Sequence, residues 1–100
     1  MKRIYRGPRL RADVANAVEH YERESATLAL KFLVAYGSAF RLLRQYPSAG
    51  SPRYAQLMGI RGLRCLATPN FPYQLFYREA PDHLVLSRIV HMSRDIPSLL

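Results

Sequence analysis

The chain has little cysteine, little acid and no long apolar run, and each shortage excludes a class of protein. Cys65 is the one cysteine among 100 residues, which excludes an internal disulfide and a cysteine-based zinc cluster. No apolar run approaches the roughly 18 residues that are needed to cross a bilayer. The basic start, MKRIYRGPRL, is not followed by the apolar stretch of a signal peptide. We therefore expect a cytoplasmic protein with no membrane association.

Motifs for the common chemistries are also missing. The sequence contains no G-x-G-x-x-G, no Walker phosphate loop and no H-E-x-x-H. His20, His83 and His91 stand far apart and have no cysteine or carboxylate neighbour at metal-ligand spacing. No metal and no cofactor is therefore expected. Cys65 alternates with Arg64 in a predicted strand, which is typical of a small buried hydrophobe rather than of a nucleophile.

What the chain does have is positive charge. Fifteen basic residues against seven acidic ones give a net charge of +8, and thirteen of the fifteen are arginine, which suits bidentate binding of phosphate and carboxylate. This asymmetry favours an acidic partner, either nucleic acid or protein, over the alternative of a basic surface that only keeps the protein soluble. No carboxylate lies between Glu24 and Glu79. The cations in that interval are Lys31, Arg41, Arg44, Arg53, Arg61, Arg64 and Arg78.

The first half of the chain predicts one strand and two helices within a single domain that spans residues 1–100. Residues 4–9 alternate until Gly7-Pro8, which is typical of a short edge strand. Ser25 or Thr27 is placed to cap the second helix, and Pro47 ends it. The first helix is predicted from one apolar face of Val14, Ala17, Val18 and Tyr21.

The second predicted helix is longer and carries a glycine near its middle. Gly37 costs about 1 kcal/mol relative to alanine at such a position, which predicts a close approach of the first helix. The short connection between the helices predicts an antiparallel helical hairpin. The apolar stripe of the second helix is predicted to contain Ala29, Phe32, Leu33, Tyr36, Phe40 and Leu43.

The second half predicts three strands. Residues 47–52 form a loop rich in proline, glycine and serine, and residues 57–60 are ambiguous between a strand end and a turn. Residues 63–68 alternate, and the run 71–91 is typical of a hairpin that turns at Glu79-Ala80-Pro81-Asp82. We expect an α+β fold of order β-α-α-β-β-β. Its last three strands form an antiparallel meander, and both helices pack on one face of the sheet.

Several short motifs resemble one toxin family. The chain resembles ParE-type toxins of the RelE/ParE superfamily at five places in its second half. These are the P-x-x-G loop, Leu63-Arg64, Pro72-Tyr73, Leu75-Phe76-Tyr77 and the segment from Val90-His91 to Arg94-Asp95. The resemblance implies the toxin of a type II toxin–antitoxin system. Such a toxin inhibits DNA gyrase without catalytic residues of its own.

The resemblance also implies partners. A cognate antitoxin would neutralise the toxin through a helix and an added strand, and operator DNA would be contacted only through that antitoxin. We expect coupled folding to add core to a small domain, so that the toxin is more stable in the complex. The expected antitoxin groove contains Tyr36, Phe40, Tyr73 and Phe76.

The RelE branch of the superfamily offers an alternative, a metal-independent endoribonuclease that cuts mRNA on the ribosome. This chain departs from that pattern, because residues 53–64 contain no lysine and residues 96–100 contain no Tyr, His or Lys. If it is a ribonuclease, the residues expected to act are Arg64, Arg88, His91 and Arg94, and His91 would serve as the acid or base, since histidine is the usual side chain for that role near neutral pH. A third interpretation is a family member that only binds its antitoxin or regulates its own transcription with it.

The arginines of the strands can also form a cationic patch that contacts the target. Two local alternatives stay open: Arg88 can be a buried arginine that pairs with Asp95 or a chain terminus, and Arg94-Asp95 can form a local ion pair. The predicted target-binding patch contains Arg61, Arg64, Arg78, Arg88 and Arg94.

Overall fold

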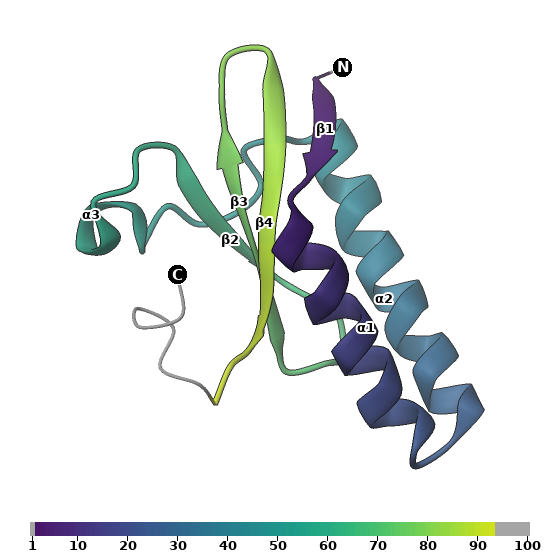
Figure 1. Cartoon of the computed structure of the whole chain (residues 1–100). Helices are drawn as coiled ribbons and strands as arrows, with labels where there is room; N and C mark the ends of the chain where they lie inside the picture. The colour runs from purple at the N-terminus through teal and green to yellow at the C-terminus, as the bar shows by residue number, and fades with distance from the viewer. Residues whose placement is uncertain (1, 94–100) are drawn as a thin grey trace.

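The computed structural model describes residues 2–93 and confirms the predicted order of elements, with one short helix added. A four-stranded sheet is covered on one face by two long helices (Figure 1). The elements are β1 (Arg3–Arg6), α1 (Pro8–Glu22), α2 (Ala26–Gln45), α3 (Ala55–Met58), β2 (Leu63–Ala67), β3 (Tyr73–Glu79) and β4 (His83–His91).

The sheet has the strand order β1-β4-β3-β2 and is mixed. Strands β2, β3 and β4 form the predicted antiparallel meander, whereas β1 pairs with β4 in parallel. The register of that parallel pair runs from Arg3 opposite His83 to Arg6 opposite Leu86. Strand β1 therefore covers only the first half of β4. The second half of β4 leaves its outer edge to α1, and this is where the candidate site lies.

Local sequence explains where the helices begin and end. Pro8 opens α1, because its fixed φ suits the first helical position, which needs no N–H partner. Ser25 caps α2 as predicted, and its hydroxyl accepts a hydrogen bond of 3.0 Å from the amide of Leu28. Helix α2 ends at Gln45, before Pro47.

The main core fills the space between the helices and the sheet. Phe32 of α2 is fully buried at its centre, with ring centroids 5.6 Å from Tyr21, 5.5 Å from Phe71 and 5.4 Å from Tyr73. Such tilted and edge-on aromatic contacts stabilise a core beyond the area that they bury. The aromatic cluster ties α1, α2 and the start of β3 together.

The opposite face of the sheet is covered as well, by the segment whose structure the sequence left ambiguous. Helix α3 and the residues around it place Tyr54 and Met58 over the strands. Gly59 ends this helix with a positive φ of 66°, which only glycine adopts without strain. The buried residues beneath the cover are Leu63, Cys65, Phe76 and Val90.

Two predictions for α2 are wrong. Leu33 is 39% exposed, and the buried face instead contains Ala35 and Ala39, whose small side chains let the helix lie close to its neighbours. A Cβ on Gly37 would meet only the guanidinium of Arg41, at 3.3 Å, so α1 does not approach this glycine.

Among residues 2–93, α2 is the one helix that is long and apolar enough to cross a membrane by length and composition.

Candidate functional site

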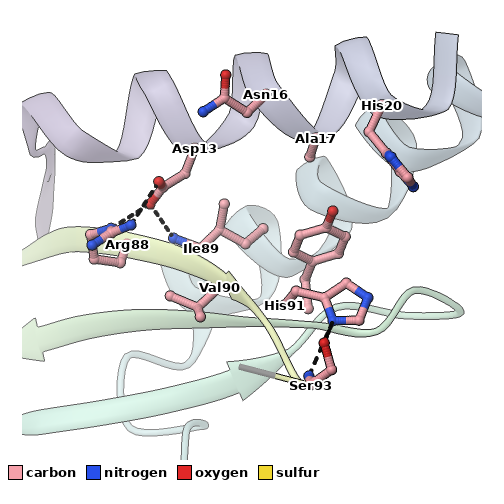
Figure 2. A pocket seen from close by; sticks show the side chains of 10 residues that line it. Asp13, Asn16, Ala17, His20, Arg88, Ile89, Val90, His91 and Ser93 are labelled. Carbon is pink, nitrogen blue, oxygen red and sulfur yellow. Dashed lines mark hydrogen bonds and ion pairs between the residues drawn. The ribbon is translucent and has the colours of Figure 1, made fainter. Parts of the chain in front are cut away.

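A polar cavity of about 440 Å³ lies between α1 and the end of β4, and we call it the α1–β4 pocket (Figure 2). It exists because β1 stops pairing at Leu86, so the rest of the β4 edge faces the polar side of α1. The residues that line it are Asp13, Asn16, Ala17 and His20 of α1, Tyr73, Arg88, Ile89, Val90 and His91 of the sheet, and Ser93 just after β4.

A carboxylate–guanidinium pair closes one end of the pocket. Asp13 accepts hydrogen bonds from Arg88 Nε at 2.6 Å and Nη2 at 3.0 Å, and from the amide of Ile89 at 3.1 Å. The side chains of Asp13 and Arg88 are only 13% and 15% exposed. The hydrogen bonds to Asp13 raise the pKa of Arg88 above its ordinary value, because they favour the charged form. The pair therefore holds α1 onto β4 where β1 no longer covers the strand.

Two histidines face each other across the other end of the pocket, His20 from α1 and His91 from β4 (Figure 2). The amide of Ser93 donates to Nδ1 of His91 at 3.1 Å, and the Ser93 hydroxyl lies 2.7 Å from the same atom. Because an amide N–H can only donate, Nδ1 is an acceptor and the neutral ring carries its proton on Nε2. The ring also packs edge-on against Tyr73, with centroids 5.2 Å apart. The pocket thus presents a fixed imidazole with one N–H donor.

The backbone of β4 adds further polar groups to this pocket. The amide of Met92 donates to the carbonyl of Pro72 at 2.8 Å, so Met92 points its backbone toward β3. Backbone groups alternate along a strand, so the N–H and C=O of His91 point to the opposite, outer edge. The backbone groups of His91 can therefore form hydrogen bonds with a polar chain or side chain in the pocket. Arg88 is already bound to the carboxylate of Asp13.

A second polar network lies at the far end of the sheet, around Glu79. Its carboxylate accepts hydrogen bonds from Ser48 at 2.8 Å, Arg64 at 3.0 Å and Lys2 at 3.1 Å. The Ser48 hydrogen bond, followed by the Lys2 and Arg64 interactions, lowers the pKa of Glu79 below its ordinary value. Arg64 also donates to the carbonyl of Gly50 at 2.7 Å. This network ties the N-terminal segment and the loop after α2 to the sheet.

Comparison with known proteins identifies the family. The family profile of the ParE toxin of the type II toxin-antitoxin system, parDE, matches residues 5–96. The chain belongs to the ParE toxin family. A solved structure described as the chromosomal ParDE TA system from P. aeruginosa superposes with a TM-score of 0.75 and 21% sequence identity, over 91% of this chain and 96% of that one. The search of curated proteins finds no match.

The ParE fold separates the arginines that the sequence grouped as one patch. Arg64 is bound to Glu79 at one end of the sheet, and Arg88 is bound to Asp13 beneath α1. Arg61 and Arg78 are exposed. Arg94 and Asp95 lie outside the described residues. Within residues 2–93, Arg88 pairs with Asp13, a carboxylate that is distant in sequence, and the sequence did not suggest this partner.

The predicted antitoxin groove is also divided in this ParE toxin. Tyr36 lines a shallow apolar groove of about 300 Å³ between α1 and α2, and Phe40 lies under the guanidinium of Arg6 at 4.4 Å. Tyr73 belongs to the core and the α1–β4 pocket. Phe76 is fully buried on the opposite face of the sheet. The structure brings Tyr36 and Phe40 together on the helical hairpin but not the other two residues.

Sequence reasoning missed two residues of the α1–β4 pocket. Nothing local in the sequence indicates that Asp13 meets Arg88, 75 positions later. His20 follows Ala17 by three positions, so the helical period does place it beside the buried face. That period was the one signal in the sequence that pointed to His20.

Proposed function

We propose that this ParE-family toxin inhibits DNA gyrase by binding it, without chemistry of its own, and that a cognate ParD antitoxin holds it inactive. One observation carries the proposal: the two strand arginines that an RNA-cleaving site would use are each bound to a carboxylate, in separate places. Arg64 is paired with Glu79 and Arg88 with Asp13. A cation stabilises a cleaving phosphate only when it is aimed at the developing charge.

The packing on the other face of the sheet supports the same proposal. Tyr54 and Met58 cover buried apolar residues there, including Phe76, so apolar packing fills the described part of that face. The exposed positive charges lie on loops, strand ends and helices, and Arg61 and Arg78 are two of the exposed arginines. An exposed basic surface suits long-range attraction to an acidic protein or to DNA that gyrase holds.

The remaining parts of the proposal concern the cell. The toxin acts in the cytoplasm, where gyrase and its antitoxin are found, and it contacts operator DNA only through the antitoxin. It needs no metal and no cofactor.

The experiment is a gyrase supercoiling assay with purified toxin, run beside a coupled translation reaction. We expect loss of supercoiling or accumulation of cleaved DNA, with translation intact. Arg61→Ala combined with Arg78→Ala should weaken inhibition, whereas Arg23→Ala, which removes an exposed arginine that pairs with Glu19 on α1, is the matched control. Normal supercoiling at toxin concentrations that arrest growth would overturn the proposal.

The ribosome-dependent ribonuclease is the second candidate, because the α1–β4 pocket does bring two of its expected residues together. Arg88 and His91 both line this pocket, and His20 faces His91 there. The translation arm of the same experiment tests it. Cleaved mRNA together with normal supercoiling would favour the ribonuclease over the gyrase inhibitor, provided that His91→Ala abolishes the mRNA cleavage.

A further inference from the structure

Helix α3 stands apart from the two long helices, on the opposite face of the sheet (Figure 1). Its inner side is fixed to the sheet, because Ala55 and Met58 pack on the buried cluster there. Its outer side presents Gln56 and Leu57, and Leu57 is 69% exposed. A single exposed leucine is ordinary by itself. What distinguishes Leu57 is the charge that lies near it.

Three exposed arginines belong to the same side of the sheet as Leu57. Arg53 and Arg61 flank α3, four residues to either side of Leu57. Arg78 pairs with Leu63 across β2 and β3, and paired residues share one face of a sheet, so Arg78 lies on the face that α3 covers. None of the three arginines forms an ion pair with a carboxylate within residues 2–93. We call the surface of Arg53, Gln56, Leu57, Arg61 and Arg78 the α3 tip.

The α3 tip is ordered before it meets a partner. The guanidinium of Arg53 lies over the ring of Tyr54, 4.9 Å from its centroid, and Tyr54 packs against the buried ring of Phe76 with centroids 5.5 Å apart. An arginine that is already held loses less side-chain entropy when it binds. Gly59 ends α3, and nothing lies within 4 Å of the place where its Cβ would be. Another molecule can therefore come close to the backbone just after Leu57.

The composition of the α3 tip favours nucleic acid over protein as the partner. A stable protein–protein interface covers about 800 Å² on each partner around an apolar core, whereas the α3 tip has one exposed apolar side chain among cations. Interfaces with DNA are more polar and far more positive. Proteins of the minor groove combine arginine and glutamine with an apolar wedge, often leucine, that enters between two base pairs. Gln56 and Leu57 stand side by side in this way between Arg53 and Arg61.

We propose that the α3 tip binds duplex DNA directly, with its three arginines on phosphates and Leu57 inserted between base pairs from the minor groove. The inference rests on the proposed function and deepens it, because the duplex is the one that gyrase holds. Insertion of the leucine unstacks a base step and kinks the duplex. A kinked step is displaced from the geometry that resealing of the cut strands requires, so cleaved DNA accumulates. The contact is independent of base sequence and does not select the operator.

The first test measures binding of purified toxin to a fluorescein-labelled DNA duplex of mixed sequence, by fluorescence anisotropy over a range of salt concentrations. Arg53→Ala, Arg61→Ala and Arg78→Ala should each weaken binding and make the slope of log affinity against log salt less steep by about 1, because each removes one phosphate contact. The matched control is Arg23→Ala on α1, which removes an exposed arginine that pairs with Glu19 and should change neither quantity. Arginine variants that keep the wild-type slope would overturn the inference.

Leu57 supplies a readout that charge alone cannot give. A duplex that carries 2-aminopurine beside a flexible TA step becomes more fluorescent when that base is unstacked. Wild-type toxin should raise this fluorescence, whereas Leu57→Ala should abolish the rise and weaken binding about fivefold at an unchanged salt slope. Leu57→Met keeps an apolar wedge and should restore both. The matched control is Leu30→Ala, which changes a leucine that is 63% exposed on α2, and it should behave as wild type.

The other outcomes separate the possible partners. Equal behaviour of Leu57→Ala and Leu30→Ala would overturn the inference. Tighter binding of single-stranded RNA than of the duplex would assign the α3 tip to RNA, and failure of Leu57→Ala to bind gyrase in the absence of DNA would assign it to a protein contact. Either result overturns the DNA assignment. Toxin that inhibits supercoiling but binds no duplex refutes the DNA contact alone, whereas toxin that binds the duplex as expected but leaves gyrase active refutes only the proposed function.

Discussion

The ion pair between Asp13 and Arg88 should be highly sensitive to mutation, because both side chains are mostly buried. Asp13→Ala removes three hydrogen bonds and leaves the Arg88 guanidinium mostly buried, since that side chain is 15% exposed. Breaking a buried pair from one side costs about 3–5 kcal/mol. Both side chains keep some contact with water, so we expect about 3 kcal/mol. For a domain of this size that loss lowers the melting temperature by about 12–24 °C.

The assay is urea unfolding followed by circular dichroism at neutral pH, in which the midpoint should fall at an unchanged slope. Asp13→Asn keeps one oxygen for the Ile89 amide and for Arg88 Nε, but it replaces the other with an amide group that cannot accept from Arg88 Nη2, so the charge and one hydrogen bond are lost and we expect a cost of about 1.5–3 kcal/mol. The control is Glu19→Ala on the same helix, whose pair with Arg23 is 66% and 74% exposed and is worth about 0.3–0.5 kcal/mol.

A double-mutant cycle decides whether the two charges depend on each other. Arg88→Met keeps the apolar stem and removes the charge, so the pair Asp13→Ala with Arg88→Met should be less destabilised than the sum of the single changes. If Asp13→Ala costs no more than Glu19→Ala, the pair does not anchor α1 to β4 and the reasoning is refuted.

Three other predictions follow from the described contacts. The pKa of Glu79 is lower in the folded state, so its stabilising effect is present above about pH 4.3 and is lost as the pH falls through the folded value. The urea midpoint should therefore fall more between pH 6 and pH 3 in the wild type than in Glu79→Gln. Parallel curves for the two proteins would contradict this. Gly50→Ala should lower the free energy of unfolding by about 2–3 kcal/mol in the same assay, because the new Cβ would lie 2.7 Å from the Tyr77 hydroxyl and 2.9 Å from the Cys65 carbonyl oxygen. A variant as stable as the wild type would show that the loop can shift and would contradict this. Burial raises the pKa of the Cys65 thiol, so a thiol reagent at pH 8 should react only as fast as the chain opens, and rapid labelling of native protein would refute the buried position.

The sequence predicted the elements well because each carries its own local signal. The cap at Ser25, the stop at Pro47 and the alternation in the last strands all act within a few residues, and the structure has them where the patterns predict. The short helix α3 was missed because four residues are too few to show a helical period, and its end depends on the positive φ of Gly59.

The site was predicted less well because its contacts join distant parts of the chain. Arg88 and Asp13 are 75 positions apart, and Arg64 and Glu79 are 15 apart on paired strands. A bulge in the pairing between Phe76 and Tyr77 also shifts the register opposite Arg88. Counting alternate positions from either end of β4 therefore assigns its faces inconsistently. The sequence predicted Arg88 and His91 as site residues, but only the tertiary arrangement joins them to Asp13 and His20.

The same distinction explains how a chain of +8 can use arginine in two ways. Arg64 and Arg88 are held by carboxylates in partly buried contacts, where they fix the loop after α2 and helix α1. Arg41, Arg61 and Arg78 stay exposed, and none of them forms an ion pair with a carboxylate within residues 2–93. Exposed charge governs attraction and is screened by salt, whereas a buried pair is screened much less. We therefore expect added salt to weaken the antitoxin complex well before it affects the fold, because salt screens the attraction of exposed arginines for an acidic partner much more than it screens the partly buried pairs.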